Sequence, residues 1–428
     1  YNLINGEYMK NLFQDYSDKI AEFGVHDPAI IKTKGKYYTI STHGYFQIRE
    51  SNDLIHWFDN KNSCFNQTTI QNELKEGIEY CHVEVPKSRN LASPFWAPDI
   101  IKIGSKYFLY YSISSFGSTQ SFIGLAKSKN ILGPYKNQGK IISSKSGGNI
   151  ELPNAIDPCV KFDKDKKLWL SYGSFFGGIY IIELNKTSGL SKNNKIGTHI
   201  AGGKMAPIEG SFITYNKKTD YYYLFLSFGS LVDSYNVRVA RSKNIFGPYL
   251  DPNGKIMTDT DWDNLGGIII ANYRFLHQNH TYTAPGHNSI LQDGKKFYFV
   301  HHTRLDEKAD KHYLNIRSMY FNELDWPVVM PNRYAHDKLY LSNKNINGTY
   351  NVIHLSKRTS TKTNESISIE IQLNRNLTKH KQYIQFFTND KIYYGVMAST
   401  YDEGLNMYTL AFSAMSKDGE TIYAIKIK

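Results

Sequence analysis

The stretch SKNILGPY at residues 128–135 returns almost unchanged as SKNIFGPY at residues 242–249, and a looser copy, SNDLIHW, stands at residues 51–57. Repetition at long intervals indicates a fold that uses one structural unit several times. Each copy follows the second half of a run of short strand patterns, so it resembles the outer hairpin of such a unit. The sequence therefore predicts a repeat architecture.

A second pattern occurs five times: a polar or acidic residue, a short apolar strand, a turn of Lys, Gly or Asp, and an aromatic strand. The segments begin at His26-Asp27-Pro28, Ala97-Pro98-Asp99, Ile156-Asp157-Pro158, Ile208-Glu209-Gly210 and Gly286-His287-Asn288. Each interval is long enough for one four-stranded antiparallel sheet with its loops. Few windows show a helical period, and short alternating runs between turns are frequent.

These repeats predict an all-β protein in which residues 1–335 form a five-bladed β-propeller, because radial repetition of small sheets limits exposed edges. The alternative is a β-sandwich or an irregular all-β domain with coincidental repeats. Two independent motifs that recur in phase favour the propeller.

The innermost strand of each blade should line a central channel. We expect Asp27, Asp99, Asp157, Glu209 and His287 to hold one register at the start of these strands and to point toward the axis. Proline beside three of these positions fits the start of a strand. Four carboxylates and an imidazole, far apart in the sequence, would then share one funnel.

After residue 335 the repeat stops. Residues 336–428 read as a smaller C-terminal β domain, sandwich- or barrel-like, with strand patterns at 366–371, 392–397 and 408–413. No acid cluster or metal-ligand spacing occurs in it. A structural cap and a carbohydrate-binding module both remain open for this domain.

Composition limits the class of protein. Of 428 residues, 41% are hydrophobic and 21% charged, which is typical of a globular chain. No stretch approaches 18 apolar residues, so we expect no membrane partner. Cys64, Cys81 and Cys159 form no CxxC pair, which argues against a thiolate zinc site. No signal peptide stands at Tyr1, so we expect the numbering to begin on a mature or trimmed chain.

The net charge of +12 has two interpretations, a polyanion partner or a generic solvated surface. Lysines are scattered through turns such as those at residues 34–36 and 164–167, and no basic helix stands out. The generic surface is favoured, so we expect a monomer that does not bind nucleic acid.

Carboxylates in a concave site have two main uses. Calcium takes six to eight oxygen ligands, often from one loop, whereas these acids come singly from different blades. Glycoside hydrolysis needs one acid to protonate the leaving oxygen and a second to activate water or attack the sugar. A third acid nearby raises the pKa of the proton donor. Glu209 has the longer side chain and precedes Gly210-Ser211, so it can reach a leaving group.

The motifs HDP at 26–28, NAIDP at 154–158, IEGS at 208–211 and GHNS at 286–289 resemble the successive motifs of glycoside hydrolase family 43, and most closely those of its endo-α-1,5-L-arabinanases. FWAPD at 95–99 is similar to the second-blade motif. IYYGV at 392–396 and TLAFS at 409–413 resemble the C-terminal β domain of the two-domain extracellular arabinanases. The resemblance covers nearly the whole chain.

This resemblance implies a secreted, inverting endo-hydrolase of α-1,5-linked L-arabinofuranose chains, the arabinan side chains of pectin. Asp27 matches the general base and Glu209 the general acid. Asp157 matches the acid that orients the sugar and raises the pKa of the donor. Asp99 matches no catalytic role, and we expect a structural hydrogen bond there.

The resemblance also implies binding residues. His287 matches a histidine near a largely water-coordinated, calcium-type ion in the channel, although a buried core histidine is the alternative. Trp96 matches an aromatic position beside the substrate groove, with plain core packing as its alternative. The further candidates for substrate binding are Asn154, Ser174, His302 and Arg304.

Two other functions stay open. An exo-acting α-L-arabinofuranosidase or β-xylosidase of the same fold would carry the same acids and differ only in a blocked groove. A non-catalytic propeller that binds polysaccharide or an anionic partner would not need the carboxylates at all.

Overall fold

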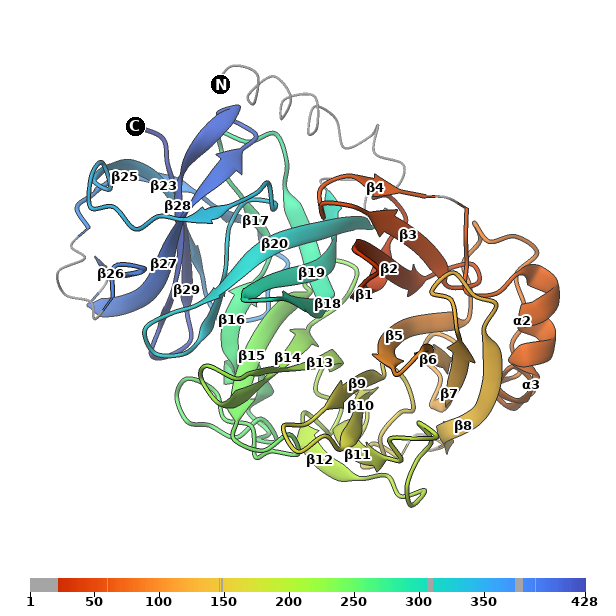
Figure 1. Ribbon diagram of the computed structural model, residues 1–428. Helices are drawn as coiled ribbons and strands as arrows, with labels where there is room; N and C mark the ends of the chain where they lie inside the picture. Colours follow the sequence, from red (N-terminus) through yellow and green to blue (C-terminus); the bar gives the residue numbers. More distant parts are fainter. Residues whose placement is uncertain are drawn as a thin grey trace.

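The computed structural model describes residues 22–59, 61–145, 147, 149–305, 311–373, 380–388 and 390–428. Five small antiparallel sheets stand around a common axis, and a further β domain packs beside the fourth and fifth of them (Figure 1). The predicted all-β, five-bladed propeller with a smaller C-terminal β domain is confirmed.

Each blade runs from an inner to an outer strand in chain order. The first blade comprises β1 (His26–Thr33), β2 (Lys36–Thr42), β3 (Gln47–Ser51) and β4 (Trp57–Phe58), and the second β5 (Phe95–Ile103), β6 (Lys106–Ile113), β7 (Gln120–Ser128) and β8 (Lys136–Lys145). The third comprises β9 (Cys159–Phe162), β10 (Leu168–Ser174), β11 (Gly178–Leu184) and β12 (Thr198–Ala201). The fourth comprises β13 (Ile208–Asn216), β14 (Tyr221–Phe228), β15 (Asn236–Ser242) and β16 (Gly267–Ile270), and the fifth β18 (Tyr282–Asp293), β19 (Lys296–Leu305), β20 (Tyr313–Phe321) and β21 (Pro327–Val329).

The aromatic segments of the sequence form the second strand of each blade. In β6 every residue after Lys106 is buried, because this strand lies between neighbouring strands and between neighbouring blades. A strand covered on both faces needs a continuous apolar run rather than an alternating one. The tight turn that leads from β1 to β2 uses Lys34 and Gly35, both with positive φ, as a short hairpin requires.

The three copies of the SKNI-type motif all connect the third strand of a blade to its outer region. Residues 128–135 join β7 to β8, residues 242–249 leave β15, and residues 51–57 join β3 to β4. In the two closer copies the terminal tyrosine folds back on its own loop, since Tyr135 donates to the Ile131 carbonyl at 3.0 Å and Tyr249 to the Ile245 carbonyl at 2.7 Å. The expected outer-hairpin position is confirmed.

A kink in the left-handed region of φ stands at the start of every inner strand, inside the strand in four blades and just before β9 in the third. The residues with positive φ are Asp27, Ala97, Asp157, Gly210 and His287. In four blades the pairing register shifts across the kink, as in a β-bulge. The kink turns the backbone N–H out of its own sheet, and such a buried donor needs another partner.

In each blade the preceding blade supplies that partner. The five bonds, called the inter-blade ring below, are Asp27 N to His302 Nδ1 at 3.1 Å, Ala97 N to Thr42 Oγ1 at 2.7 Å, Asp157 N to Ser112 Oγ at 3.0 Å, Gly210 N to Asp157 Oδ2 at 3.1 Å and His287 N to Ser227 Oγ at 2.8 Å. The last blade thus bonds to the first. The ring is closed on one face of the propeller.

The residues of the inter-blade ring show that the expected common register of the five acidic or polar residues is wrong in two blades. In the second blade the kinked residue is Ala97, so Asp99 lies two residues further along the strand. In the fourth blade it is Gly210, so Glu209 lies one residue before it. The error arose because the repeat was aligned on acidic side chains, whereas the recurring feature is a backbone conformation.

Asp99 instead stabilises the contact between two blades. Its carboxyl group is buried, with the residue 4% exposed, and Oδ2 accepts from the backbone N–H of Val160 on β9 at 2.7 Å. The expected structural hydrogen bond is therefore present.

Further contacts join the first and fifth blades. Phe23 forms an isolated bridge with Tyr313, and the Gly24 N–H donates to the His312 carbonyl at 2.8 Å. The Ser289 hydroxyl donates to the Pro28 carbonyl. Two short helices, α2 (Gln67–Glu73) and α3 (Lys75–Cys81), lie in the insertion before the second blade.

The C-terminal domain is built on one antiparallel sheet. Its strands are β22 (Lys338–Leu339), β23 (Gly348–Leu355), β25 (Ile367–Ile371), β26 (Tyr383–Thr388), β27 (Lys391–Asp402), β28 (Met407–Ser416) and β29 (Thr421–Lys426). A short strand, β24 (Asn364–Glu365), leaves this domain and pairs in parallel with β17 (Tyr273–Arg274) of the fifth-blade sheet. The turn η2 (Trp262–Asn264) lies before β16.

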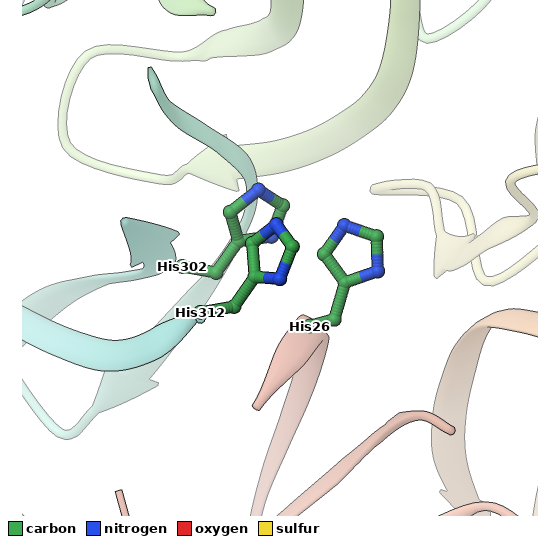
Figure 2. Close-up of side chains that lie close together, drawn as sticks. All are labelled: His26, His302 and His312. Atoms are coloured by element: carbon green, nitrogen blue, oxygen red, sulfur yellow. The ribbon is translucent and has the colours of Figure 1, made fainter. Parts of the chain in front are cut away.

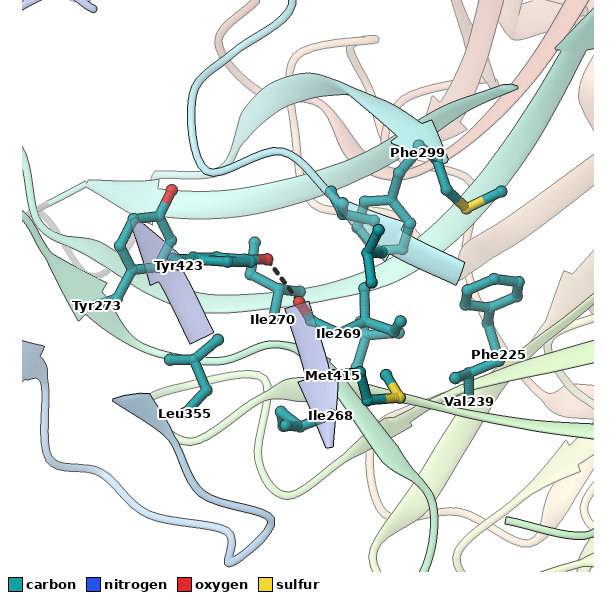
Figure 3. Packing of buried hydrophobic residues seen from close by; sticks show 14 of the residues in the cluster. Phe225, Val239, Ile268, Ile269, Ile270, Tyr273, Phe299, Leu355, Met415 and Tyr423 are labelled. Carbon is teal, nitrogen blue, oxygen red and sulfur yellow. Dashed lines mark hydrogen bonds between the residues drawn. The ribbon is translucent and has the colours of Figure 1, made fainter. Parts of the chain in front are cut away.

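One hydrophobic core crosses the junction of the two domains. Tyr423 and Met415 of the C-terminal sheet pack with Ile268, Ile269 and other residues of the propeller, and the Tyr423 hydroxyl donates to the Ile269 carbonyl (Figure 3). The domains are therefore packed together, not merely linked.

Two sequence expectations concern the remaining features. All three cysteines, which form no CxxC pair in the sequence, are free and buried. Among the described residues, no helix combines the length and the apolar character needed to span a bilayer.

We predict that Asp99→Ala lowers the free energy of unfolding by about 1–3 kcal/mol, because the buried N–H of Val160 loses its acceptor. Urea unfolding followed by tryptophan fluorescence measures the change. Asp165→Ala, at an exposed position of a nearby turn, is the control and should stay within about 0.5 kcal/mol of the parent. An equal loss in both variants would contradict the structural role of Asp99.

Candidate active site

Asp27 is held at the mouth of the first blade by contacts on several sides. Its Oδ2 accepts from the Thr42 hydroxyl at 2.6 Å, and its Oδ1 lies 3.2 Å from His287 Nδ1. His26 Nδ1 lies 3.3 Å from Oδ2. Thr42 also accepts from Ala97 N, so the hydroxyl that binds this carboxylate belongs to the inter-blade ring. The ring thereby fixes Asp27 in position.

Asp157 and Glu209 are connected through one backbone amide. Asp157 Oδ2 accepts from the N–H of Gly210, the residue directly after Glu209. Glu209 receives two hydroxyl donors, Ser174 Oγ on Oε2 at 2.9 Å and Tyr235 on Oε1. Because a hydroxyl can donate or accept, both contacts are compatible with the charged and with the protonated form of Glu209.

His287 lies among the acidic groups. Burial lowers its pKa, but the negative charges of Asp27, Asp157 and Glu209 together raise it above the ordinary histidine value. The imidazole therefore carries a positive charge over a wider pH range. The three predicted acids and His287 interact electrostatically, so the structure brings them into one site.

The three carboxyl groups differ in acidity. Burial alone would raise the pKa of Asp27, but the imidazoles of His26 and His287 and the Thr42 hydroxyl lower it below the ordinary value. Burial raises the pKa of Glu209, even though Tyr235 and Ser174 favour its charged form. Asp27 is thus suited to accept a proton and Glu209 to donate one.

Asp157 titrates near neutrality. Burial raises its pKa to about 7, the charges of Glu209 and Asp27 raise it as well, and His287 opposes them. Because like charges resist joint ionisation, Asp157 and Glu209 share their protons as a coupled pair.

A cluster of neutral imidazoles lies behind Asp27. His26, His302 and His312 offer ring nitrogens within 4.8 Å of one another (Figure 2). Burial lowers the pKa of His26 to about 4 and lowers those of the other two as well. Within the described part of the chain, no other group of three or more such side chains has metal-binding spacing.

This cluster is a poor match for calcium, which takes oxygen ligands, because it offers only nitrogen. A hydrogen bond also limits what His302 can offer to a metal ion. His302 Nδ1 accepts from the Asp27 N–H, so in a neutral ring the proton must sit on Nε2 and that atom is a donor. These three imidazoles therefore do not fit a calcium ion. A mostly hydrated ion near His287, as the family resemblance implies, stays a prediction.

The other candidate residues occupy different surroundings. Trp96 is half-buried at the start of β5, and its indole N–H donates to the Ser93 carbonyl at 2.6 Å. Asn154 is buried and binds Ser144 Oγ at 3.0 Å and the Ser118 carbonyl at 3.3 Å. Arg304 is buried and lies close enough to His26 and His312 to lower their pKa values.

Two residues of the site were missed by the sequence analysis. Thr42 is the last residue of the aromatic strand of the first blade, and Ser112 and Ser227 are the last but one of theirs, so the recurring hydroxyl was a usable signal. Tyr235 gave no such signal, because it is one of 33 tyrosines and lies 26 residues from the Glu209 that it binds.

The chain is similar to known proteins along nearly its whole length. The model for glycosyl hydrolases family 43 matches residues 17–327, and that of a C-terminal lipocalin-like domain matches residues 331–424. An extracellular endo-α-(1→5)-L-arabinanase of Thermotoga petrophila is 33% identical, with 94% of each chain covered, and extracellular endo-α-(1→5)-L-arabinanase 2 of Bacillus subtilis is 33% identical over 95% of this chain and 93% of its own. The crystal structure of the Thermotoga petrophila endo-1,5-α-L-arabinanase superposes with a TM-score of 0.85, 33% identity, and coverage of 94% of this chain and 98% of that one.

We predict that Asp27→Asn lowers the pKa of His287, because the largest of the charges that raise it is removed. An NMR titration of the histidine ring resonances measures this shift, with His287 assigned from a His287→Gln variant. Asp53→Asn removes an equivalent partner from His56, at 2.6 Å, and should leave His287 unchanged. A His287 titration that is the same in Asp27→Asn and in the parent would show that the pair is not formed.

Proposed function

Because the chain belongs to glycoside hydrolase family 43, we propose that it is a secreted, inverting endo-hydrolase of the α-1,5-L-arabinofuranosidic bonds of arabinan. The observation that supports this most directly is the grouping of Asp27, Asp157 and Glu209, from three separate blades, around His287. The pKa of Asp27 is lowered and that of Glu209 is raised, which divides them into a base and an acid.

In the proposed reaction, Asp27 removes a proton from a water molecule that attacks the anomeric carbon. Glu209 gives its proton to the departing glycosidic oxygen as the bond breaks. Inversion needs room for that water, so we expect the two carboxyl groups to be about 6.5–9.5 Å apart. A separation near 5 Å would instead favour retention through a covalent intermediate.

Asp157 and His287 act on these two groups. Asp157 holds the Gly210 N–H and keeps the backbone beside Glu209 in place, and these two carboxyl groups resist joint ionisation. The charged form of His287 stabilises the Asp27 carboxylate in its basic form. We assign Asp157 and His287 to orienting Glu209 and Asp27 and to setting the pKa values of these two groups.

The extracellular relatives support secretion of this chain. The full-length similarity to two endo-acting enzymes favours endo over exo cleavage, although an exo-acting relative with the same acids remains the alternative. The products distinguish the two modes, because an endo enzyme releases mixed oligomers early and an exo enzyme releases mainly monomer.

We predict that debranched arabinan is converted first to mixed arabino-oligosaccharides, and that Asp27→Ala and Glu209→Ala each reduce kcat by about 10²–10⁴-fold. Chromatography of the products over time gives the pattern, and NMR of the first anomer formed reports inversion. Calorimetric titration with an arabino-oligosaccharide should show that both variants still bind. Asp165→Ala serves as the control with parental activity. Full hydrolytic activity in either active-site variant would contradict the roles of Asp27 and Glu209, whereas a parent protein that binds arabinan without releasing products would support the non-catalytic alternative.

We further predict that Asp157→Asn moves the basic limb of the kcat/KM profile to lower pH. Removing a negative charge beside Glu209 favours its ionised form, so the proton donor is lost at a lower pH than in the parent. The acidic limb, which reflects ionisation of Asp27, should stay nearly in place, because Asp157, with a pKa of about 7, is already protonated over the pH range in which Asp27 titrates. A basic limb that stays in place or rises would refute the coupling of Asp157 to Glu209.

A further inference from the structure

The side chain of Tyr235 holds the proton donor, and its own position is set by a loop. Residues 229–235 connect β14 to β15, and Tyr235 at the end of this loop donates to Glu209 Oε1. The ring packs directly on Gly286, where an added Cβ would lie 2.2 Å from Tyr235 Cδ2, and stacks at 6.0 Å on His302. Tyr235 is buried between these contacts, so a shift of the loop that carries it would move the ring relative to Glu209.

The C-terminal domain reaches this loop through the segment between β23 and β25. Thr359 Oγ1 accepts from Arg238 Nη2 at 2.9 Å and from Asn236 Nδ2 at 3.4 Å. The Thr359 methyl group packs on Gly229, where an added Cβ would lie 2.8 Å from it. Thr359 thus contacts the first residue of the loop and the residue that follows Tyr235.

Arg238, on β15 of the propeller, links Thr359 to other propeller residues through its hydrogen bonds. Its side chain is fully buried, and it donates through Nε to Asn236 Oδ1 at 2.8 Å and through Nη1 to the Asp263 carbonyl at 2.8 Å. A buried guanidinium needs an acceptor for each of its N–H groups. Loss of the Thr359 hydroxyl would leave it short of one acceptor and disturb Asn236, the neighbour of Tyr235.

A second contact holds the same loop. Asn272 Nδ2 donates to the Asp233 carbonyl in the loop at 2.6 Å and to the Thr361 carbonyl of the C-terminal segment at 3.3 Å. The Asn364 N–H donates to the Asn272 carbonyl at 3.1 Å, at the start of the β17–β24 pairing. The segment of the C-terminal domain therefore reaches the loop directly through Thr359 and indirectly through Asn272.

We propose that the C-terminal domain positions the proton donor of the propeller, with Thr359 as the positioning residue that acts on Glu209 through Asn236, Arg238 and Tyr235. This inference rests on the proposed function, and it gives the domain a role in the reaction beyond that of a structural cap or a carbohydrate-binding module. Thr359 itself touches neither the substrate nor Glu209.

The test compares Thr359→Val, which removes the hydroxyl and keeps the shape, with Thr359→Ser, which keeps the hydroxyl. The matched control is Thr421→Val, because Thr421 also bonds across the domain junction, to the Ile268 carbonyl at 2.6 Å, but on a strand that does not lead to the loop. Thermal unfolding of all three variants separates loss of stability from loss of positioning.

We expect Thr359→Val to lower kcat on debranched arabinan by about tenfold or more, with little change in KM. A weaker Tyr235 bond raises the pKa of Glu209, so the basic limb should move to higher pH. Thr359→Ser should restore the parental profile, and Thr421→Val should keep it. An aryl arabino-oligosaccharide with a good leaving group should be less affected, since its departure needs less proton donation.

A double-mutant cycle with Tyr235→Phe gives the decisive result. If Thr359 acts through the Tyr235 hydroxyl, Thr359→Val should cause no further shift of the basic limb once that hydroxyl is gone. Additive shifts, or a Thr359→Val profile identical to that of Thr421→Val, would overturn the proposal. A ¹³C NMR titration of the Glu209 carboxyl, assigned with Glu209→Gln, reads the same pKa shift without turnover. Inactivity of the parent on arabinan would refute the proposed function, and this titration would still decide the positioning role.

Discussion

The geometry of the protein depends on one backbone constraint, the kink at the start of each inner strand. At Asp27, Ala97, Asp157, Gly210 and His287 the chain adopts positive φ, and the N–H leaves its own sheet. Such a donor is costly to bury without an acceptor, and in every case the acceptor comes from the preceding blade. The bonds that close the inter-blade ring therefore also place the acids. Asp27 and Asp157 are members of the ring, and Glu209 stands beside the member Gly210.

Positive φ is unfavourable for residues other than glycine, and three of the five kinked residues directly precede proline, which restricts the backbone further. Strained backbone of this kind persists where the surrounding structure over-determines it. Here the surrounding structure is the neighbouring blade, so the strain is distributed around the whole propeller. This links the stability of the fold to the precision of the site.

The chemical difference between the acids comes from their surroundings. Burial raises the pKa of Asp27, Asp157 and Glu209 alike, and only Asp27 has enough positive and hydrogen-bonding partners to reverse the effect. The two hydroxyls on Glu209 set the extent to which its pKa is raised. One of them, from Tyr235, depends on a loop that the C-terminal domain holds, so the acidity of the site is coupled to the domain junction.

The amino-acid sequence alone determined the five-bladed repeat and the C-terminal β domain, and it indicated which acids lie together, because strand periodicity and local motifs are recorded in neighbouring residues. It did not determine which residue of each motif is kinked. The sequence pattern suggested Asp99 and Glu209, but Asp99 lies two residues after the kinked Ala97 and Glu209 one residue before the kinked Gly210, since side-chain type does not reveal backbone φ. Tyr235 and Thr359 lie 26 and 150 residues from Glu209 along the chain, and no local pattern marks them. Only the tertiary structure decides such partners, because hydrogen bonds and pKa values depend on which groups packing brings together and on how much water it removes.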